Sequence, residues 1–191
     1  MKNNLTRCKW PGNNEISIKY HDSEWGFPIH KDDLLFEYLI LDTFQAGLSW
    51  QIILNKRKNF QKAFHNFDVK KISNYSEKDR IRLLNDVGIV RNRLKIKSAI
   101  TNAQKFLEVQ KEFGSFDKYI WQFTNYKTLQ NNFKKMTDLP SKTFESDEMS
   151  KDLKKRGFKF CGSTICYAFM QAIGMVNDHT TDCFRYNEVK I

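Results

Sequence analysis

Proline and glycine are scarce in this chain, and it has no long uninterrupted apolar run. Three prolines and eight glycines among 191 residues are too few for a many-turned β-sandwich. The longest apolar stretch, residues 39–54, contains Asp42 and is therefore not typical of a transmembrane helix. The first residues, MKNNLTRCKW, are polar and lack the apolar centre of a signal peptide. We therefore expect a cytoplasmic protein with no membrane partner.

Acidic residues are also outnumbered, which indicates the kind of partner. The chain has 22 Asp and Glu against 32 Lys and Arg, a formal net charge of +10. Such a surplus favours a polyanionic partner, of which nucleic acid is the commonest. Hydrophobic residues make up 40% of the chain, including 16 phenylalanines, so a buried core is expected rather than disorder. We expect one domain over residues 1–191, and a monomer.

Helical patterns account for most of the chain, and no convincing alternating strand is present. Residues 32–41 begin with acids suited to a first helical turn and continue apolar on nearly every face, as in a helix buried all round. Further helices are predicted near residues 50–64, 96–107, 146–156 and 165–173. Lys95 lies opposite the apolar side of 96–107. The predicted fold class is all-α.

Gly88 lies between two predicted helices in LLNDVGIVRNRLKI. Ser76 and Asp79 predict a capping box that starts the first of these helices, and the whole motif covers about 76–112. A short Gly-centred turn of this kind is typical of a helix-hairpin-helix, whose backbone N–H groups bind phosphate. Arg91 and Arg93 follow directly. The alternative is an ordinary corner between two helices, in which glycine serves only the backbone angles.

Two Cys/His pairs at opposite ends of the chain suggest a metal site. Cys8 and His21 are separated by 12 residues, and His179 and Cys183 by three. Together they provide the four ligands of a closed, structural zinc site, which would join the terminal segments. The spacing is not that of a standard zinc finger, so unrelated buried thiols and surface imidazoles are the alternative. The other two cysteines, Cys161 and Cys166, could compete as ligands.

Aromatic residues gather around one acid in the N-terminal part of the chain. They are Trp10, Tyr20, Trp25 and Trp50. Indoles beside polar groups can hold a flat ligand such as a base, and Asp42 and Gly47 lie in the apolar stretch just before the last of them. For any single tryptophan, a place in the core is the alternative. The pattern favours a pocket lined by aromatic rings and one carboxylate.

Several long motifs resemble the bacterial DNA-3-methyladenine glycosylase I family. They are RCKW, YHDSEWGFP, FQAGLSW, GIVRNRLKI and KKRGFKFCGSTICYAFMQAIGMVNDH, and the match runs from Arg7 to about Cys183. The resemblance implies an all-α fold of the helix-hairpin-helix glycosylase superfamily, with one structural zinc joining the N- and C-terminal segments. It also implies base-excision repair of double-stranded DNA: release of 3-methyladenine by hydrolysis, without strand cleavage.

The resemblance assigns roles residue by residue. Trp50 matches the indole that stacks on the damaged base, Tyr20 matches a tyrosine of the same pocket, and Leu48, beside Gly47, matches the residue that fills the gap left by the flipped nucleotide. Trp10 and Trp25 match aromatic wall positions. The Gly88 turn matches the phosphate-binding hairpin. The metal ligands of the family match Cys8, His21, His179 and Cys183.

Two positions depart from the family pattern. The family usually has glutamate where this chain has Asp42, and the acid at this position accepts hydrogen bonds from the base edge. The family often has tyrosine where this chain has Ser17. Aspartate is one methylene shorter, so its carboxylate must lie closer to the base, reach it through a water, or bind it less well. Serine removes a ring and would enlarge the pocket. These departures bear on the range of bases more than on the class of reaction.

Asp42 is expected to recognise the base, with water as the nucleophile. The base leaves as a neutral molecule, so a strong general acid is not needed, and no lysine Schiff base is implied. Two alternatives stay open: a DNA-binding relative without activity, or a glycosylase with a shifted preference, such as one for 3-methylguanine. A purely structural helical scaffold explains neither the charge nor the pocket residues.

Overall fold

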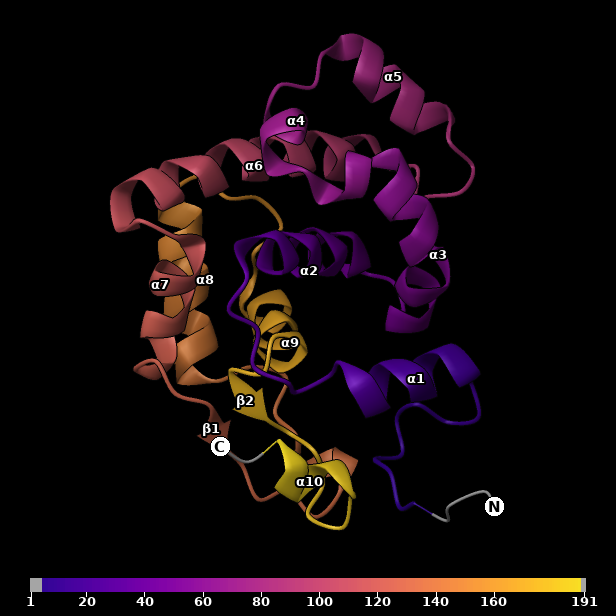
Figure 1. Ribbon diagram of the computed structural model, residues 1–191, viewed down its shortest axis with the longest axis vertical. Helices are drawn as coiled ribbons and strands as arrows, with labels where there is room; N and C mark the ends of the chain where they lie inside the picture. Colours follow the sequence, from indigo (N-terminus) through magenta and orange to yellow (C-terminus); the bar gives the residue numbers. More distant parts are fainter. Residues whose placement is uncertain (1–4, 190–191) are drawn as a thin grey trace.

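Helix α2 (Asp32–Gln45) runs through the centre of the computed structural model, which describes residues 5–189 (Figure 1). Every residue of α2 from 35 to 44 is buried. Helix α6 (Arg93–Phe113) packs on one side and α9 (Ser163–Ala172) on the other, and α3 (Trp50–Ala63) also packs against it. The predicted all-round burial of residues 32–41 is confirmed.

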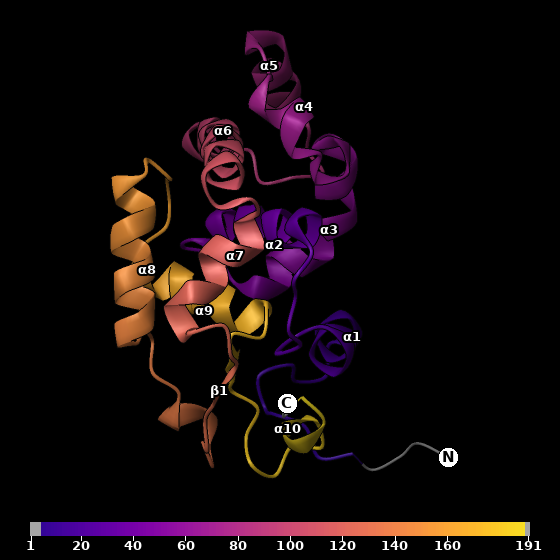
Figure 2. The ribbon, with the colours of Figure 1, turned by 60° about the vertical axis from the view of Figure 1, so that its left-hand side comes forward.

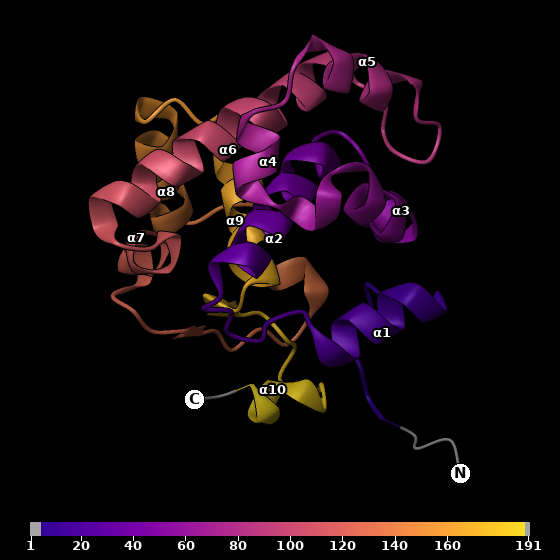
Figure 3. The ribbon, with the colours of Figure 1, turned by 45° about the horizontal axis from the view of Figure 1, so that its top comes forward.

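The remaining elements surround this centre. Helix α8 (Phe144–Lys155) packs on the outer side of α9 (Figure 2). Helix α5 (Glu77–Asn85) lies at one end of the molecule, far from α1 (Glu15–Ser23) and α10 (Arg185–Glu188) at the other (Figures 1 and 3). The short helices are α4 (Val69–Ser73), α7 (Phe116–Trp121), η1 (His65–Phe67), η2 (Gln122–Thr124) and η3 (Met136–Asp138).

Two short strands depart from the prediction of a purely helical chain. Strand β1 (Leu129–Gln130) pairs in parallel with β2 (Val176–Asn177). Each has two residues, too few to show an alternating pattern in the sequence. The pair leads directly into the segment that carries His179, so it helps to fix where that segment lies.

Lys95 is buried, whereas the sequence pattern placed it on the polar side of its helix. Its ammonium donates hydrogen bonds to the carbonyl oxygens of Phe44, at 2.7 Å, and Ala46, at 2.5 Å. These carbonyls lie at the C-terminal end of α2, where backbone acceptors lack partners within the helix and a positive charge is favourable. Burial lowers the pKa of Lys95. The basic residue therefore joins α6 to the turn that follows α2.

The predicted capping box is present at the start of α5, where the Ser76 N–H donates to Asp79 Oδ2 at 3.0 Å. Residues 86–92 connect α5 to α6, so residues 76–112 do form two helices around a short turn. Within residues 5–189, no helix has the length and apolar character needed to cross a bilayer.

Candidate active site and metal centre

A cavity of about 280 Å³ opens beside α2, between α1, α9 and the segment around η3. Its lining is mostly apolar and aromatic, with a few polar side chains, as is typical of small-molecule sites. It is lined by Trp10, Tyr20, Trp25, Asp42, Gln45, Trp50, Met136, Leu139, Ala168, Gln171 and Ala172. The structure thus brings together the four predicted aromatic residues and the predicted acid, which are separated along the chain.

The aromatic rings pack against one another in a continuous wall. The ring centroids of Tyr20 and Trp50 are 5.5 Å apart, those of Trp10 and Tyr20 are 6.1 Å apart, and those of Trp10 and Trp25 are 5.3 Å apart. Tyr20 and Trp25 are buried, while Trp10 and Trp50 are half-buried. Tilted and edge contacts of this kind hold the rings in place and leave ring surface free to face the cavity.

Two buried polar atoms of the cavity residues have no hydrogen-bond partner within residues 5–189. They are Asp42 Oδ2 and Trp10 Nε1. An unpaired buried polar group costs about 1–3 kcal/mol, so such atoms in a native structure indicate a ligand or solvent that pairs with them. One of them is a donor and the other belongs to a carboxyl group, so the cavity suits a ligand with both acceptors and donors.

Burial raises the pKa of Asp42 well above the usual range of an aspartate. The side chain lies on the fully buried helix α2 and is only 2% exposed. Its surroundings disfavour the charged form because water no longer solvates it. The sequence predicted that Asp42 acts as a carboxylate. The raised pKa means that Asp42 instead keeps its proton at pH values at which an ordinary aspartate is ionised.

Asp42→Asn is expected to stabilise the protein at neutral pH. Above the unfolded-state pKa of about 3.9 and below the raised folded-state pKa, the native protein holds a proton that the unfolded chain has released. The free energy of unfolding therefore falls with rising pH by about 1.4 kcal/mol per unit. Asparagine does not titrate, so the gain should grow between pH 4 and the folded-state pKa.

Denaturant unfolding at pH 4, 5.5 and 7 measures this gain. Asp33→Asn, on the exposed first turn of the same helix, is the matched control and should give no gain at neutral pH. A gain from Asp42→Asn that is the same at all three values would show that burial of its charge is not the cause.

The turn between α2 and α3 carries Gly47 and Leu48. Gly47 has a φ of +77°, a conformation that glycine adopts at little cost. The Leu48 N–H donates to the Gln45 carbonyl oxygen at 2.6 Å, and Gln45 Nε2 donates to the Leu48 carbonyl oxygen at 2.9 Å. Gly47 is exposed, while Leu48 is half-buried against the core. Neither residue lines the cavity, so the gap-filling role of Leu48 stays a prediction.

Ser17 lies outside the cavity, although the sequence analysis placed it among the substrate-binding residues. It is 5% exposed, and its N–H donates to the Asn14 side chain at 2.9 Å, which caps α1. It sits three residues before Tyr20, on nearly the same side of α1, but its short side chain is not among those that line the cavity. The effect of this serine on the size of the cavity stays a prediction.

Sequence reasoning missed one face of α9. Ala168, Gln171 and Ala172 line the cavity, and their i, i+3, i+4 spacing places them side by side on a helix. The two alanines leave room for the cavity, and Gln171 adds a polar side chain to it. The signal was present in CYAFMQA, where small residues recur at helical spacing beside a glutamine, but an apolar helix of this kind was taken to be simply buried.

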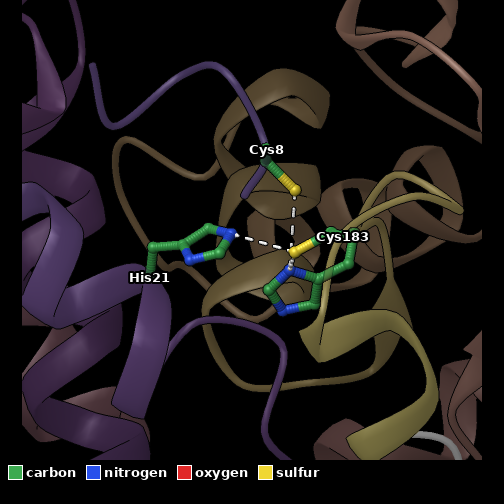
Figure 4. Close-up of side chains that lie close together, drawn as sticks. Cys8, His21 and Cys183 are labelled. Carbon is green, nitrogen blue, oxygen red and sulfur yellow. Dashed lines mark hydrogen bonds between the residues drawn. The ribbon is translucent and has the colours of Figure 1, made fainter. Parts of the chain in front are cut away.

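Cys8, His21, His179 and Cys183 form a buried cluster, as the two sequence pairs suggested. The atoms that each can offer to a metal all lie within 4.8 Å of one another. Figure 4 shows Cys8 on an N-terminal loop, His21 on α1 and Cys183 on the C-terminal segment, all pointing to one centre. Cys183 Sγ lies 3.5 Å from His21 Nε2 and 3.5 Å from His179 Nδ1, and Cys8 Sγ lies 3.6 Å from His179 Nδ1.

These distances fit a tetrahedral zinc ion. Zn–S bonds of about 2.3 Å and Zn–N bonds of about 2.0–2.1 Å place sulfur and nitrogen about 3.6 Å apart at the tetrahedral angle. The second nitrogen of each imidazole is also held: His21 Nδ1 contacts Asp22 Oδ1 at 2.8 Å, and His179 Nε2 contacts the Trp25 carbonyl oxygen at 3.0 Å. Such partners orient metal-binding histidines.

The two thiols of the cluster differ in acidity. The hydrogen bond from Cys8 lowers the pKa of Cys183, and the same contact raises the pKa of Cys8. The other cysteines lie elsewhere: Cys161 and Cys166 are buried beside α8 and α9, outside the described cluster, and burial raises the pKa of both. They do not compete as ligands.

The turn around Gly88 is tightly packed against α3. The Gly88 N–H donates to Asp86 Oδ1 at 2.8 Å, and the Gly88 carbonyl oxygen accepts from Lys56 Nζ at 3.1 Å. A Cβ on Gly88 would lie 2.9 Å from Asp86 Oδ1 and 3.2 Å from two Asn59 atoms, so close approach, and not a positive φ, favours glycine here. Its N–H is paired with the Asp86 side chain in this structure, so the phosphate contact of Gly88 stays a prediction.

Other groups of this turn remain free within the described chain. The N–H groups of Val90 and Arg91 have no hydrogen-bond acceptor among residues 5–189, and the side chains of Arg91 and Arg93 are exposed. The positive charge expected from the sequence is therefore presented to solvent, beside the N-terminus of α6.

A helical protein whose cavity has an indole wall, a buried acid and unpaired polar atoms belongs to the class that binds a flat, polar aromatic molecule. Residues 10–186 match the model of the methyladenine glycosylase family, and the chain belongs to this family. It is 43% identical over 182 residues to DNA-3-methyladenine glycosylase 1 of Escherichia coli (strain K12), covering 95% of this chain and 97% of the relative.

Solved structures agree with this membership. A crystal structure of 3-methyladenine DNA glycosylase I is 44% identical, with a TM-score of 0.92 over 94% of this chain and 98% of that one. The Staphylococcus aureus enzyme, whose structure gives the basis of its 3-methyladenine recognition, is 32% identical, with a TM-score of 0.91 over 94% of this chain and 96% of that one.

Proposed function

We propose that this protein is a monofunctional DNA glycosylase that releases 3-methyladenine from alkylated double-stranded DNA by hydrolysis. Family membership supports the class of reaction. The observation that carries the proposal is the cavity in which Trp50 and Asp42 both lie, with Asp42 Oδ2 unpaired. A flipped base would enter this cavity, because an enzyme that acts on a base must take it out of the stack.

Trp50 supplies attraction for the damaged base. Methylation at N3 makes adenine cationic within the nucleotide. A cation over an indole face gains about 1–2 kcal/mol when it is desolvated, and stacking of a base on an aromatic side chain contributes about 1–3 kcal/mol. Normal adenine is neutral and lacks the first contribution. The indole therefore favours the damaged base over the undamaged one.

Asp42 supplies recognition by charge. A cationic base beside the buried carboxyl group lowers its pKa, because opposite charges stabilise the ionised form. Asp42 then loses its proton to solvent and pairs with the base. A neutral base cannot produce this change, so it meets a protonated acid instead. The raised pKa of Asp42 in the free protein therefore helps to discriminate the cationic damaged base from neutral adenine.

Water completes the reaction. It attacks C1′ of the sugar as the bond from C1′ to N9 breaks, the bonding electrons neutralise the departing base, and the proton of the water goes to solvent. Among the described residues that line the cavity, none is a lysine, so nothing there could form a Schiff base with the sugar. This lining supports hydrolysis without strand cleavage.

The turn at residues 86–92 supports DNA binding at a distance from the cavity. The free N–H groups of Val90 and Arg91, with the exposed side chains of Arg91 and Arg93, would hold a phosphate of the DNA backbone. This assignment moves the phosphate contact two or three residues beyond Gly88, whose own N–H is already paired with Asp86. Gly88 would act by allowing the turn to pack closely against α3.

One structural zinc ion would be held by Cys8, His21, His179 and Cys183. The two cysteines and two histidines would fill all four positions, so the metal would add stability and no reactive water. The support for this assignment is the spacing of the four ligand atoms and the hydrogen bonds that orient both imidazoles.

A base-release assay tests the proposed function. Wild-type protein incubated with methylated duplex DNA is expected to release free 3-methyladenine and to leave the strands intact, as measured by chromatography of the bases and denaturing gels of the DNA. Shifted DNA mobility without any released base would identify a binding protein without activity. Release of 3-methylguanine in preference to 3-methyladenine would identify a shifted specificity.

A further inference from the structure

A buried hydrogen-bond network holds one of the cavity residues in a fixed orientation. Asp178, 1% exposed, accepts three hydrogen bonds at 2.7 Å: from Tyr167 Oη and Gln171 Nε2 on Oδ2, and from Asn131 Nδ2 on Oδ1. A buried carboxylate with several donors is a strong, well-defined acceptor.

This network determines which end of the Gln171 amide faces away from Asp178. A carboxylate has only acceptors, so it must meet the NH₂ of the amide. The carbonyl oxygen, Oε1, is then left for a molecule in the cavity, which Gln171 lines. No donor within residues 5–189 is hydrogen-bonded to Oε1. Rotation of the amide by 180° would point its NH₂ group into the cavity, but it would break the hydrogen bond to Asp178. Gln171 therefore presents an acceptor to the cavity.

We propose that Gln171, held by Asp178, is a specificity-determining residue that accepts a hydrogen bond from the exocyclic amino group of the bound base. The inference rests on the proposed function. An adenine methylated at N3 has N–H donors only on that amino group, so a fixed neutral acceptor in the cavity has one partner on the base.

Two other polar groups of the cavity, Trp10 Nε1 and the Asp42 carboxyl group, can act beside Gln171. Trp10 Nε1 is a donor only and is unpaired, so it suits a ring nitrogen of the base. Asp42 is free to act as acid or carboxylate. The amino group has two hydrogens, so it can donate to Gln171 and to Asp42 at the same time. A base without the amino group leaves Oε1 unpaired, which weakens its binding.

Binding of two free bases tests the proposal. The probes are 3-methyladenine and 3-methylpurine, which carries hydrogen in place of the amino group, and their dissociation constants are measured by calorimetry or by quenching of tryptophan fluorescence. Wild-type protein is expected to prefer 3-methyladenine. In Gln171→Met, which keeps the length of the side chain and removes the acceptor, this preference should fall about tenfold, as expected for one hydrogen bond.

The ratio of the two constants protects the test against partial misfolding, because both are measured on the same preparation. Gln171→Ala is a second variant and should lower the ratio similarly. Asn131→Ala, which removes a bond to the Asp178 oxygen that does not hold Gln171, should leave the ratio unchanged.

An unchanged ratio in both Gln171 variants overturns the proposal, and so does an equal weakening of both bases. A fall in the ratio for Asn131→Ala as large as that for Gln171→Met also overturns it. If wild-type protein neither binds nor releases 3-methyladenine, it is the proposed function that fails; if it does both and only the ratio is insensitive to Gln171, the function stands and the role of Gln171 does not.

Discussion

Trp50→Ala is expected to lower the rate of 3-methyladenine excision by roughly 100-fold with the fold preserved. The change removes the indole face on which the base would stack and the attraction of that face for a cation, together about 3 kcal/mol. Trp50 is half-buried at the first position of α3 and contacts Tyr20 at the edge of the cavity, so its loss should disturb the core little. Excision is measured on methylated duplex DNA, and folding by circular dichroism and thermal melting.

Trp50→Phe is the matched variant. It retains a smaller aromatic face and should keep more activity than alanine does. Full activity in Trp50→Ala would show that stacking on this residue does not hold the base. A large drop in the melting temperature of Trp50→Ala would show instead that the residue serves the fold.

Removal of the proposed zinc is expected to lower the melting temperature by about 8–16 °C. A metal present at a thousand times its dissociation constant stabilises the native state by about 4 kcal/mol, and in a protein of this size each kcal/mol corresponds to about 2–4 °C. The cluster joins the loop of Cys8, helix α1 and the C-terminal segment (Figure 4). Chelation, or Cys183→Ser, should therefore loosen both terminal segments.

Metal content and melting temperature are measured together, with Cys166→Ser as the control. Cys166 is also a buried cysteine but lies outside the cluster, so this variant should keep one zinc per chain. Because Trp10 and Tyr20 lie next to or near two of the ligands in sequence, chelation should also weaken binding of 3-methyladenine. Protein that melts at the same temperature with and without chelator would exclude a structural metal here.

Patterns that repeat locally were predictable from the sequence. The buried character of α2 follows from apolar residues on every face, and the start of α5 follows from Ser76 and Asp79. The aromatic residues and Asp42 could be proposed as one pocket because they cluster in the N-terminal part of the chain. The metal cluster was ambiguous from spacing alone, since its two pairs come from opposite ends of the chain; the resemblance identified it, and the geometry of four side chains supports it.

Features that depend on tertiary neighbours were not predictable. Lys95 looked like a surface residue, but the C-terminal carbonyls of α2 provide it with buried acceptors. The sequence around Gln171 could indicate the face of α9 that it shares, but not the orientation of its amide, which depends on Asp178 from the segment after β2. In each case the partner comes from another element.

The buried ammonium of Lys95 connects the start of α6 to the end of α2. It comes from the first turn of α6, just after the turn at residues 86–92, and its hydrogen bonds end at Phe44 and Ala46, two and four residues beyond Asp42. These hydrogen bonds join the start of α6 to the end of α2, the helix that carries Asp42 into the cavity wall. If a DNA phosphate is bound at residues 86–92, as proposed, the same hydrogen bonds would set the distance between that phosphate and the base that enters the cavity.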